Sequence, residues 1–84
     1  MKIGQLVKFL KSTEDTTHIM LGVVKAINPL KDDKHTEIFW LDASIPPVCL
    51  NSDIGVTNFK DAGVKAFIDE LSRTQRDILM RVVS

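Results

Sequence analysis

The chain of 84 residues is long enough for one small domain and too short for two that each bury a core. Its composition, 44% hydrophobic and 26% charged residues, excludes an intrinsically disordered chain. The 11 basic and 11 acidic residues cancel. This balance argues against a main role in binding DNA or RNA, which usually needs a basic surplus, and favours association with itself or with another protein.

The N-terminal apolar run is short and is interrupted by Lys8, so it does not fit a signal peptide. The single cysteine, Cys49, cannot form an internal disulfide. No segment approaches the roughly 20 apolar residues of a membrane span. We therefore expect a protein of the reducing cytoplasm with no membrane partner.

The first half of the chain has the period of two that strands require. Residues 5–11 place Val7 and Phe9 on one face, and a polar loop follows over residues 12–17. Residues 18–27 alternate in the same way. One face of this second strand is expected to carry Ile19, Leu21, Val23 and Ile27, and the other Met20, Gly22, Val24 and Ala26.

Asn28 and Pro29 end the second strand, and residues 36–42 predict a third. This third strand has apolar residues on both sides, with Trp40 facing one way and Phe39 the other. A strand of this kind needs a cover on each face of its sheet. After Pro46 and Pro47, residues 48–56 predict one or two short strands.

The period changes to about 3.6 from Asn58 onward, which predicts a helix that starts near Phe59 with Asn58 as its cap. Two patterns compete further on. Ser72 and Gln75 fit a capping box that begins a second helix, whereas opposite charges at a spacing of four favour one continuous helix; they are Asp69, Arg73, Asp77 and Arg81. We favour a break near Ser72, because a helix of some two dozen residues would overhang so small a sheet.

The stretches MKIGQLVKF, LGVVKAI and IFWLD resemble the small SH3-like or KOW-type barrels common among short phage and bacterial proteins. The resemblance covers residues 1–57; Gln5 stands where an acidic residue is usual, and residues 58–84 lie outside the pattern. With the alternation, it implies a single α+β domain: a strongly curved small antiparallel sheet over 1–57 with a C-terminal helical segment packed on it. An open sheet with helices on one face is the alternative.

The final stretch, LSRTQRDILMRVV, also resembles the first helix of bacterial helix-turn-helix regulators. The match covers about a dozen residues of generic amphipathic type. A recognition helix would have to follow it, and the sequence ends at Ser84. We expect a packing helix instead.

Residues suited to catalysis or metal binding are few. His18, His35 and Cys49 lack the spacing of metal ligands, and a Cys49–histidine nucleophile would have no third orienting group. The paired carboxylates Asp32 and Asp33 fall in a polar loop, and no glycine-rich phosphate loop is present. We therefore expect no enzymatic activity, no metal and no cofactor.

Protein recognition is the leading hypothesis for function, because small barrels bind peptides through exposed aromatics or at a sheet edge. The candidate anchors are Trp40, Phe39, Phe9, Met20 and, on the helical segment, Met80. A role for Trp40 in the core alone is an equal alternative, and apolar residues left exposed on the terminal helix would serve a homodimer. Resemblance to phage-type proteins implies a partner in the bacterial host, whose activity the protein modulates.

The second hypothesis is an accessory nucleic-acid-binding protein of KOW or SH3-like type that contacts the backbone. It depends on the lysines of the first half, which are Lys8, Lys11, Lys25, Lys31 and Lys34. Acidic neighbours nearly cancel their charge, and lysines also protect strand edges.

Overall fold

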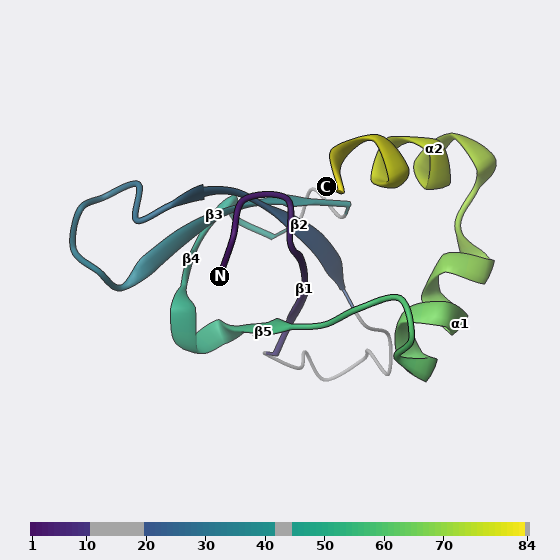
Figure 1. Ribbon diagram of the computed structural model, residues 1–84, viewed down its shortest axis with the longest axis horizontal. Helices are drawn as coiled ribbons and strands as arrows, with labels where there is room; N and C mark the ends of the chain where they lie inside the picture. Colours follow the sequence, from purple (N-terminus) through teal and green to yellow (C-terminus); the bar gives the residue numbers. More distant parts are fainter. Residues whose placement is uncertain (11–19, 42–44, 84) are drawn as a thin grey trace.

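A computed structural model describes residues 1–10, 20–41 and 45–83, and it contains one antiparallel sheet and two helices (Figure 1). The strands are β1 (Leu6–Phe9), β2 (Leu21–Ile27), β3 (His35–Trp40), β4 (Val48–Leu50) and β5 (Ile54–Val56). A single 3-10 turn, η1 (Asn51–Asp53), joins the last two strands, and α1 (Ala62–Glu70) and α2 (Arg73–Val82) follow. The α+β class is thus confirmed.

The strand order is β4-β3-β2-β1-β5, with β4 and β5 as the edges. Among the described residues, no hydrogen-bonded ladder joins β4 to β5, so the sheet is not closed into a barrel. Residues 48–56 were predicted to form one or two short strands, and two are present. Lys11, His18, Ile19 and Asp42, which the sequence placed in strands or beside them, lie outside the described residues.

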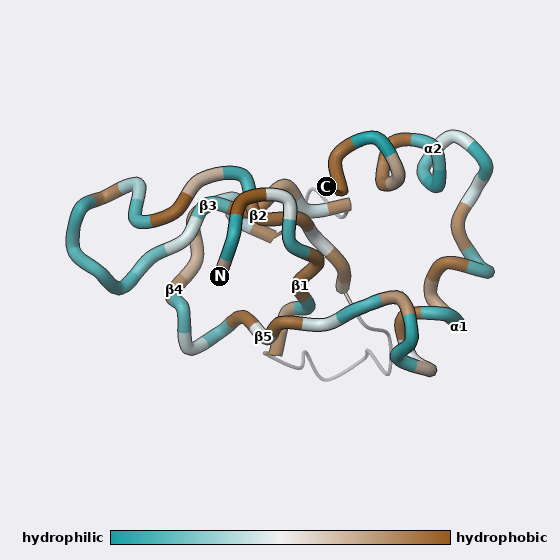
Figure 2. Tube along the Cα trace, in the orientation of Figure 1, coloured by the Kyte–Doolittle hydropathy of each residue, from teal (hydrophilic) through white to brown (hydrophobic). Residues whose placement is uncertain are grey.

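Apolar side chains line both faces of the sheet, as the two-sided third strand predicted. The inner core, on one face, consists of Val7, Val24, Ile38, Trp40, Ile45, Cys49 and Ile54. The helix-side core, on the other face, consists of Leu6, Leu21, Val23, Val64 and Leu79. Hydrophobic and hydrophilic residues alternate along both helices (Figure 2), as expected for helices with one buried side.

Two residues of β2, Ala26 and Ile27, depart from the predicted alternation. The pairing of β2 with β3 shifts between Val24 and Ala26, so Ile27 lies opposite Thr36. Thr36 shares a face with Ile38, two residues on, and this puts Ile27 on the inner side. Ala26 lies opposite Glu37, on the other face. The placements of Ile27 on the face of Leu21 and of Ala26 on the face of Val24 were therefore wrong, because a bulge at Lys25 inserts one residue into the strand.

The cap of α1 is Asp61, and the prediction of Asn58 as the cap was wrong. The Asp61 carboxylate accepts hydrogen bonds from the backbone N–H groups of Gly63 at 2.8 Å and Val64 at 3.3 Å. The Asn58 side chain accepts from the Lys60 N–H at 2.8 Å, which makes a turn before the helix. Both residues are good caps by type, and the turn at Asn58 delays the first helical residue to Ala62.

The helical segment is divided into two helices at Ser72, as predicted from the sequence. The Ser72 hydroxyl accepts from the Gln75 N–H at 3.2 Å, and the Gln75 side chain accepts from the Ser72 N–H at 3.4 Å, which completes a capping box. The Arg76 guanidinium donates to the Ile68 carbonyl at 3.0 Å and so satisfies an acceptor in the last turn of α1. The Arg76 side chain thereby links α2 to α1 across the break.

The cap assignment predicts different costs for two neighbouring substitutions. Asp61→Ala is expected to lower the free energy of unfolding by about 1 kcal/mol, because two N–H groups of α1 lose their acceptor. Asn58→Ala should cost less than about 0.5 kcal/mol, since it affects only an exposed turn. Urea denaturation of both variants measures the difference, and an equal or larger loss for Asn58→Ala would contradict the assignment.

Candidate functional site

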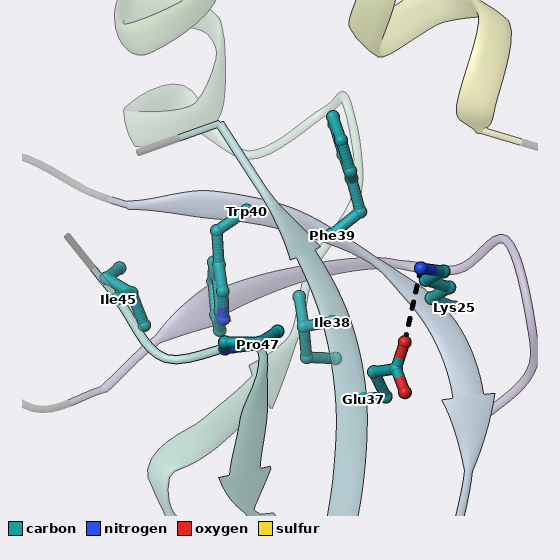
Figure 3. A pocket seen from close by; sticks show the side chains of 7 residues that line it. All are labelled: Lys25, Glu37, Ile38, Phe39, Trp40, Ile45 and Pro47. Carbon is teal, nitrogen blue, oxygen red and sulfur yellow. Dashed lines mark ion pairs between the residues drawn. The ribbon is translucent and has the colours of Figure 1, made fainter. Parts of the chain in front are cut away.

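A recess in the surface of the described chain lies beside the second half of β3. Strand β4 pairs with β3 only from His35 to Glu37, and the chain before β4 contains Pro46 and Pro47. Proline has no N–H to donate to a ladder, so regular pairing stops there, although the Pro47 carbonyl still accepts from the Ile38 N–H at 2.6 Å. The β3 pocket opens at this point, with a volume of about 230 Å³ (Figure 3). Its lining consists of Lys25, Glu37, Ile38, Phe39, Trp40, Ile45 and Pro47.

Trp40 forms a wall of the β3 pocket and belongs to the inner core, where it is 8% exposed. Its indole Nε1 donates to the Pro46 carbonyl at 3.2 Å, and the Cys49 thiol donates to the same carbonyl at 3.0 Å. The Phe9 ring meets Trp40 edge to face, with ring centroids 5.6 Å apart. These contacts hold the indole rigidly against the proline segment, which gives the pocket a fixed apolar wall.

Two more of the candidate anchors pack inside. Phe9 and Met20 are partly buried against the inner core, and neither lines the β3 pocket. Met80 is 50% exposed on α2, next to the fully buried Leu79, and it also is absent from the pocket lining. Of the five candidates, the structure therefore brings only Trp40 and Phe39 together at one recess.

Phe39 and Trp40 point to opposite sides of β3, as expected from the sequence (Figure 3). Phe39 is 38% exposed. Near it, the Lys25 ammonium lies 3.3 Å from a Glu37 carboxylate oxygen, with the two side chains 67% and 27% exposed. An exposed pair of this kind contributes less than about 1 kcal/mol to stability, so its main effect is to set one charge of each sign on the pocket rim.

The candidate lysines are dispersed. Lys25 is paired with Glu37, and Lys8 is half-buried in β1. Lys31 and Lys34 are exposed in the hairpin between β2 and β3, where Asp32 and Asp33 match their charge. Lys11 lies outside the described residues. The hairpin therefore has no basic surplus.

The two aspartates of that hairpin act as acceptors that shape the turn. Asp33 exchanges two hydrogen bonds of 2.8 Å with the Asn28 side chain. Asp32 accepts from the Lys34 N–H at 2.9 Å and contacts His35 Nδ1 at 2.5 Å. The Lys34 N–H, together with His35, lowers the pKa of the Asp32 carboxyl, so this group stays ionised and is unsuited to donate a proton near neutral pH.

The geometry disfavours Cys49 and His35 as a nucleophile and base. Cys49 faces the inner core, and burial raises the pKa of its thiol. His35 lies opposite Leu50 in the β3–β4 ladder, one position away from Cys49 and hence on the other face of the sheet. In the described parts of the chain, no group of three His, Cys, Asp or Glu residues could hold a metal ion.

The sequence did not single out Ile45 and Pro47 as lining residues, and it considered Glu37 only as a charge that offsets the lysines. The sequence predicts only short strands after the Pro46-Pro47 pair. The effect of this pair on the site depends on where β4 stops along β3, which is a matter of long-range pairing.

No family model, curated protein sequence or solved structure matches the chain. Within the described residues, neither helix has the length and apolar character of a membrane span. The fold and the site define an α+β protein with a two-sided antiparallel sheet and a small, largely apolar pocket at β3.

Proposed function

We propose that this chain is a non-enzymatic module that binds another protein through the β3 pocket. The observation that carries the proposal is the recess itself, in which the rigid Trp40 wall, Ile45 and Pro47 adjoin an exposed ion pair. Aromatic walls with polar rims are typical of the anchor points of protein interfaces. The volume of about 230 Å³ is below the roughly 300–1,000 Å³ of small-molecule sites, and it suits one side chain of a partner.

The strand beside the pocket suggests how the rest of the partner segment would lie. The Leu41 N–H bonds to the Leu21 carbonyl of the neighbouring strand. Backbone groups alternate in direction along an antiparallel strand. The N–H and C=O groups of Trp40 therefore point away from β2, toward the side of β3 that β4 no longer pairs with. An extended partner segment would continue the ladder there while its apolar side chain enters the pocket.

We also propose that the sheet, although open between β4 and β5, has the curvature of an SH3-like barrel. Leu50 and Ile54 belong to opposite edge strands but are separated only by η1. Four residue steps span at most about 14 Å, whereas four strand spacings of a flat sheet cover about 19 Å. Cys49 and Ile54 also share the inner core. These observations favour a curled sheet whose edges approach each other.

The resemblance to phage-type small proteins extends the proposal to location and partner. On that basis the protein acts in the bacterial cytoplasm, where it binds a host protein and modulates it. The alternative, a nucleic-acid-binding protein of the same barrel type, would use the dispersed lysines.

Affinity capture of the tagged protein from a bacterial lysate, with and without nuclease, separates the two classes. We expect a protein in stoichiometric amount that survives nuclease and moderate salt, because an apolar pocket binds with little release of counterions. Capture that disappears on nuclease treatment, or that falls steeply with salt, would overturn the proposal in favour of nucleic acid.

A further inference from the structure

One part of the sheet face that carries the helices is left uncovered by them. Figure 1 shows α1 and α2 beside one end of the sheet, while the β2–β3 hairpin extends in the opposite direction. Within the uncovered part, we define the outer patch as Lys25, Glu37, Phe39, Val48 and Leu50; Ala26 and His35 adjoin it on the same face. Phe39 and Leu50 are 38% and 43% exposed.

The strand register places the members of the outer patch on one surface. Ile38 belongs to the inner core, so Glu37 and Phe39 point to the opposite face. The ladder sets Val48 opposite Glu37 and Leu50 opposite His35, which carries both apolar residues of β4 to that same face. The Lys25 ammonium reaches Glu37 from β2.

The charges of the outer patch are balanced and adjacent. Lys25 and Glu37 lie 3.3 Å apart at the border of the apolar residues. A strongly acidic or basic partner would meet one attractive and one repulsive charge here. A second copy related by a two-fold axis would instead present its Glu37 to Lys25 and its Lys25 to Glu37, since both halves of such an interface are the same surface.

We propose that a second copy of this chain covers the outer patch. Each Lys25 pairs with Glu37 of the other copy, and the apolar residues around Phe39 meet near the two-fold axis. The formal charge of zero imposes no net repulsion on this association. The inference goes beyond the proposed function. The dimer shares Lys25, Glu37 and Phe39 with the β3 pocket, so a second copy and a partner protein compete for that rim.

The outer patch is small, and the dimer is accordingly weak. Specific stable interfaces bury at least about 1,200 Å² in total, which five side chains from each copy do not reach. The association should therefore require high protein concentration and should be lost at high salt, because its charge pairs are exposed.

Sedimentation equilibrium of the purified protein and two charge-reversed variants tests the proposal. Lys25→Glu gives the outer patch two negative charges, and Glu37→Lys gives it two positive charges. We expect each variant alone to dimerise about tenfold more weakly than the wild type, because like charges then face each other. An equimolar mixture should associate at least as strongly as the wild type.

The mixture separates an interface from a structural role within one molecule. Both variants lose the internal Lys25–Glu37 contact, so a purely internal role predicts no recovery on mixing. A wild-type protein that stays monomeric at about 1 mM would overturn the proposal, because its dissociation constant would then be too high for a specific dimer. A mixture that is no more associated than its components would also overturn it. These samples contain no partner protein, so the outcome is independent of the proposed function.

Discussion

Replacement of Gly22 by alanine is expected to lower the free energy of unfolding by about 2–3 kcal/mol, in the upper part of the range for overpacked cores. A Cβ at this position would lie 2.5 Å from Ile38 Cγ2, 2.6 Å from Trp40 Cε3 and 2.9 Å from the Phe39 carbonyl oxygen. The backbone oxygen and the rigidly held indole cannot move aside cheaply. In a domain of this size the loss should lower the melting temperature by about 10–20 °C.

Gly55→Ala provides a matched control within the same sheet. The three atoms nearest to its Cβ would all belong to the Leu10 side chain, with Cδ2 at 2.9 Å. Leu10 is largely exposed and can rotate away, so the expected loss is below about 1 kcal/mol. Thermal and urea denaturation of both variants measure the contrast. Equal stability of the two variants would show that β2 does not lie against Trp40 as described.

Leu79→Ala is expected to cost about 3 kcal/mol, within the range for truncating a buried leucine. Leu79 is fully buried and is the only described residue of α2 in that class. It joins α2 to Leu6, Leu21 and Val23 of the sheet and to Val64 of α1. Its truncation removes the one fully buried apolar side chain among the described residues of α2, so α2 should also exchange its amide hydrogens faster.

Met80→Ala is the control for that prediction, because Met80 is the next residue along α2 and is half exposed. Its loss should be within about 0.5 kcal/mol. Urea denaturation gives the free energies, and hydrogen exchange reports on α2 alone. A Leu79→Ala variant that matches Met80→Ala in both measurements would contradict the packing of α2 on the sheet.

Local periodicity was enough to predict the strands and the two-sided sheet. The alternation that put Ile38 and Trp40 on one side of β3 and Phe39 on the other is a property of adjacent residues, and the structure keeps it. The break at Ser72 was also readable, since a capping box needs only residues three positions apart.

Features that depend on contacts between distant residues were harder to predict from the sequence. The bulge at Lys25 changes the face of Ile27 through pairing with β3, and no local pattern marks it. Asn58 and Asp61 both have the chemistry of a cap, and the turn that engages Asn58 decided between them.

The candidate site shows the same division. The aromatic residues Phe39 and Trp40 were singled out by type, and the structure places both at the β3 pocket. Ile45 and Pro47 enter the pocket only because β4 stops pairing at Glu37, which requires the register of the whole sheet. Sequence alone likewise could not distinguish Phe39 on the sheet from Met80 on α2 as the binding surface.

Isothermal titration calorimetry of the captured partner with purified Phe39→Ala and Met80→Ala variants locates the surface that binds the partner. Both variants shorten an exposed apolar side chain, and only Phe39 lines the β3 pocket. With the β3 pocket as the binding site, Phe39→Ala should bind the partner at least about tenfold more weakly, as for an interface anchor. Met80→Ala should change the affinity by less than about twofold. Full binding by Phe39→Ala with loss of binding by Met80→Ala would contradict the account and move the site to α2.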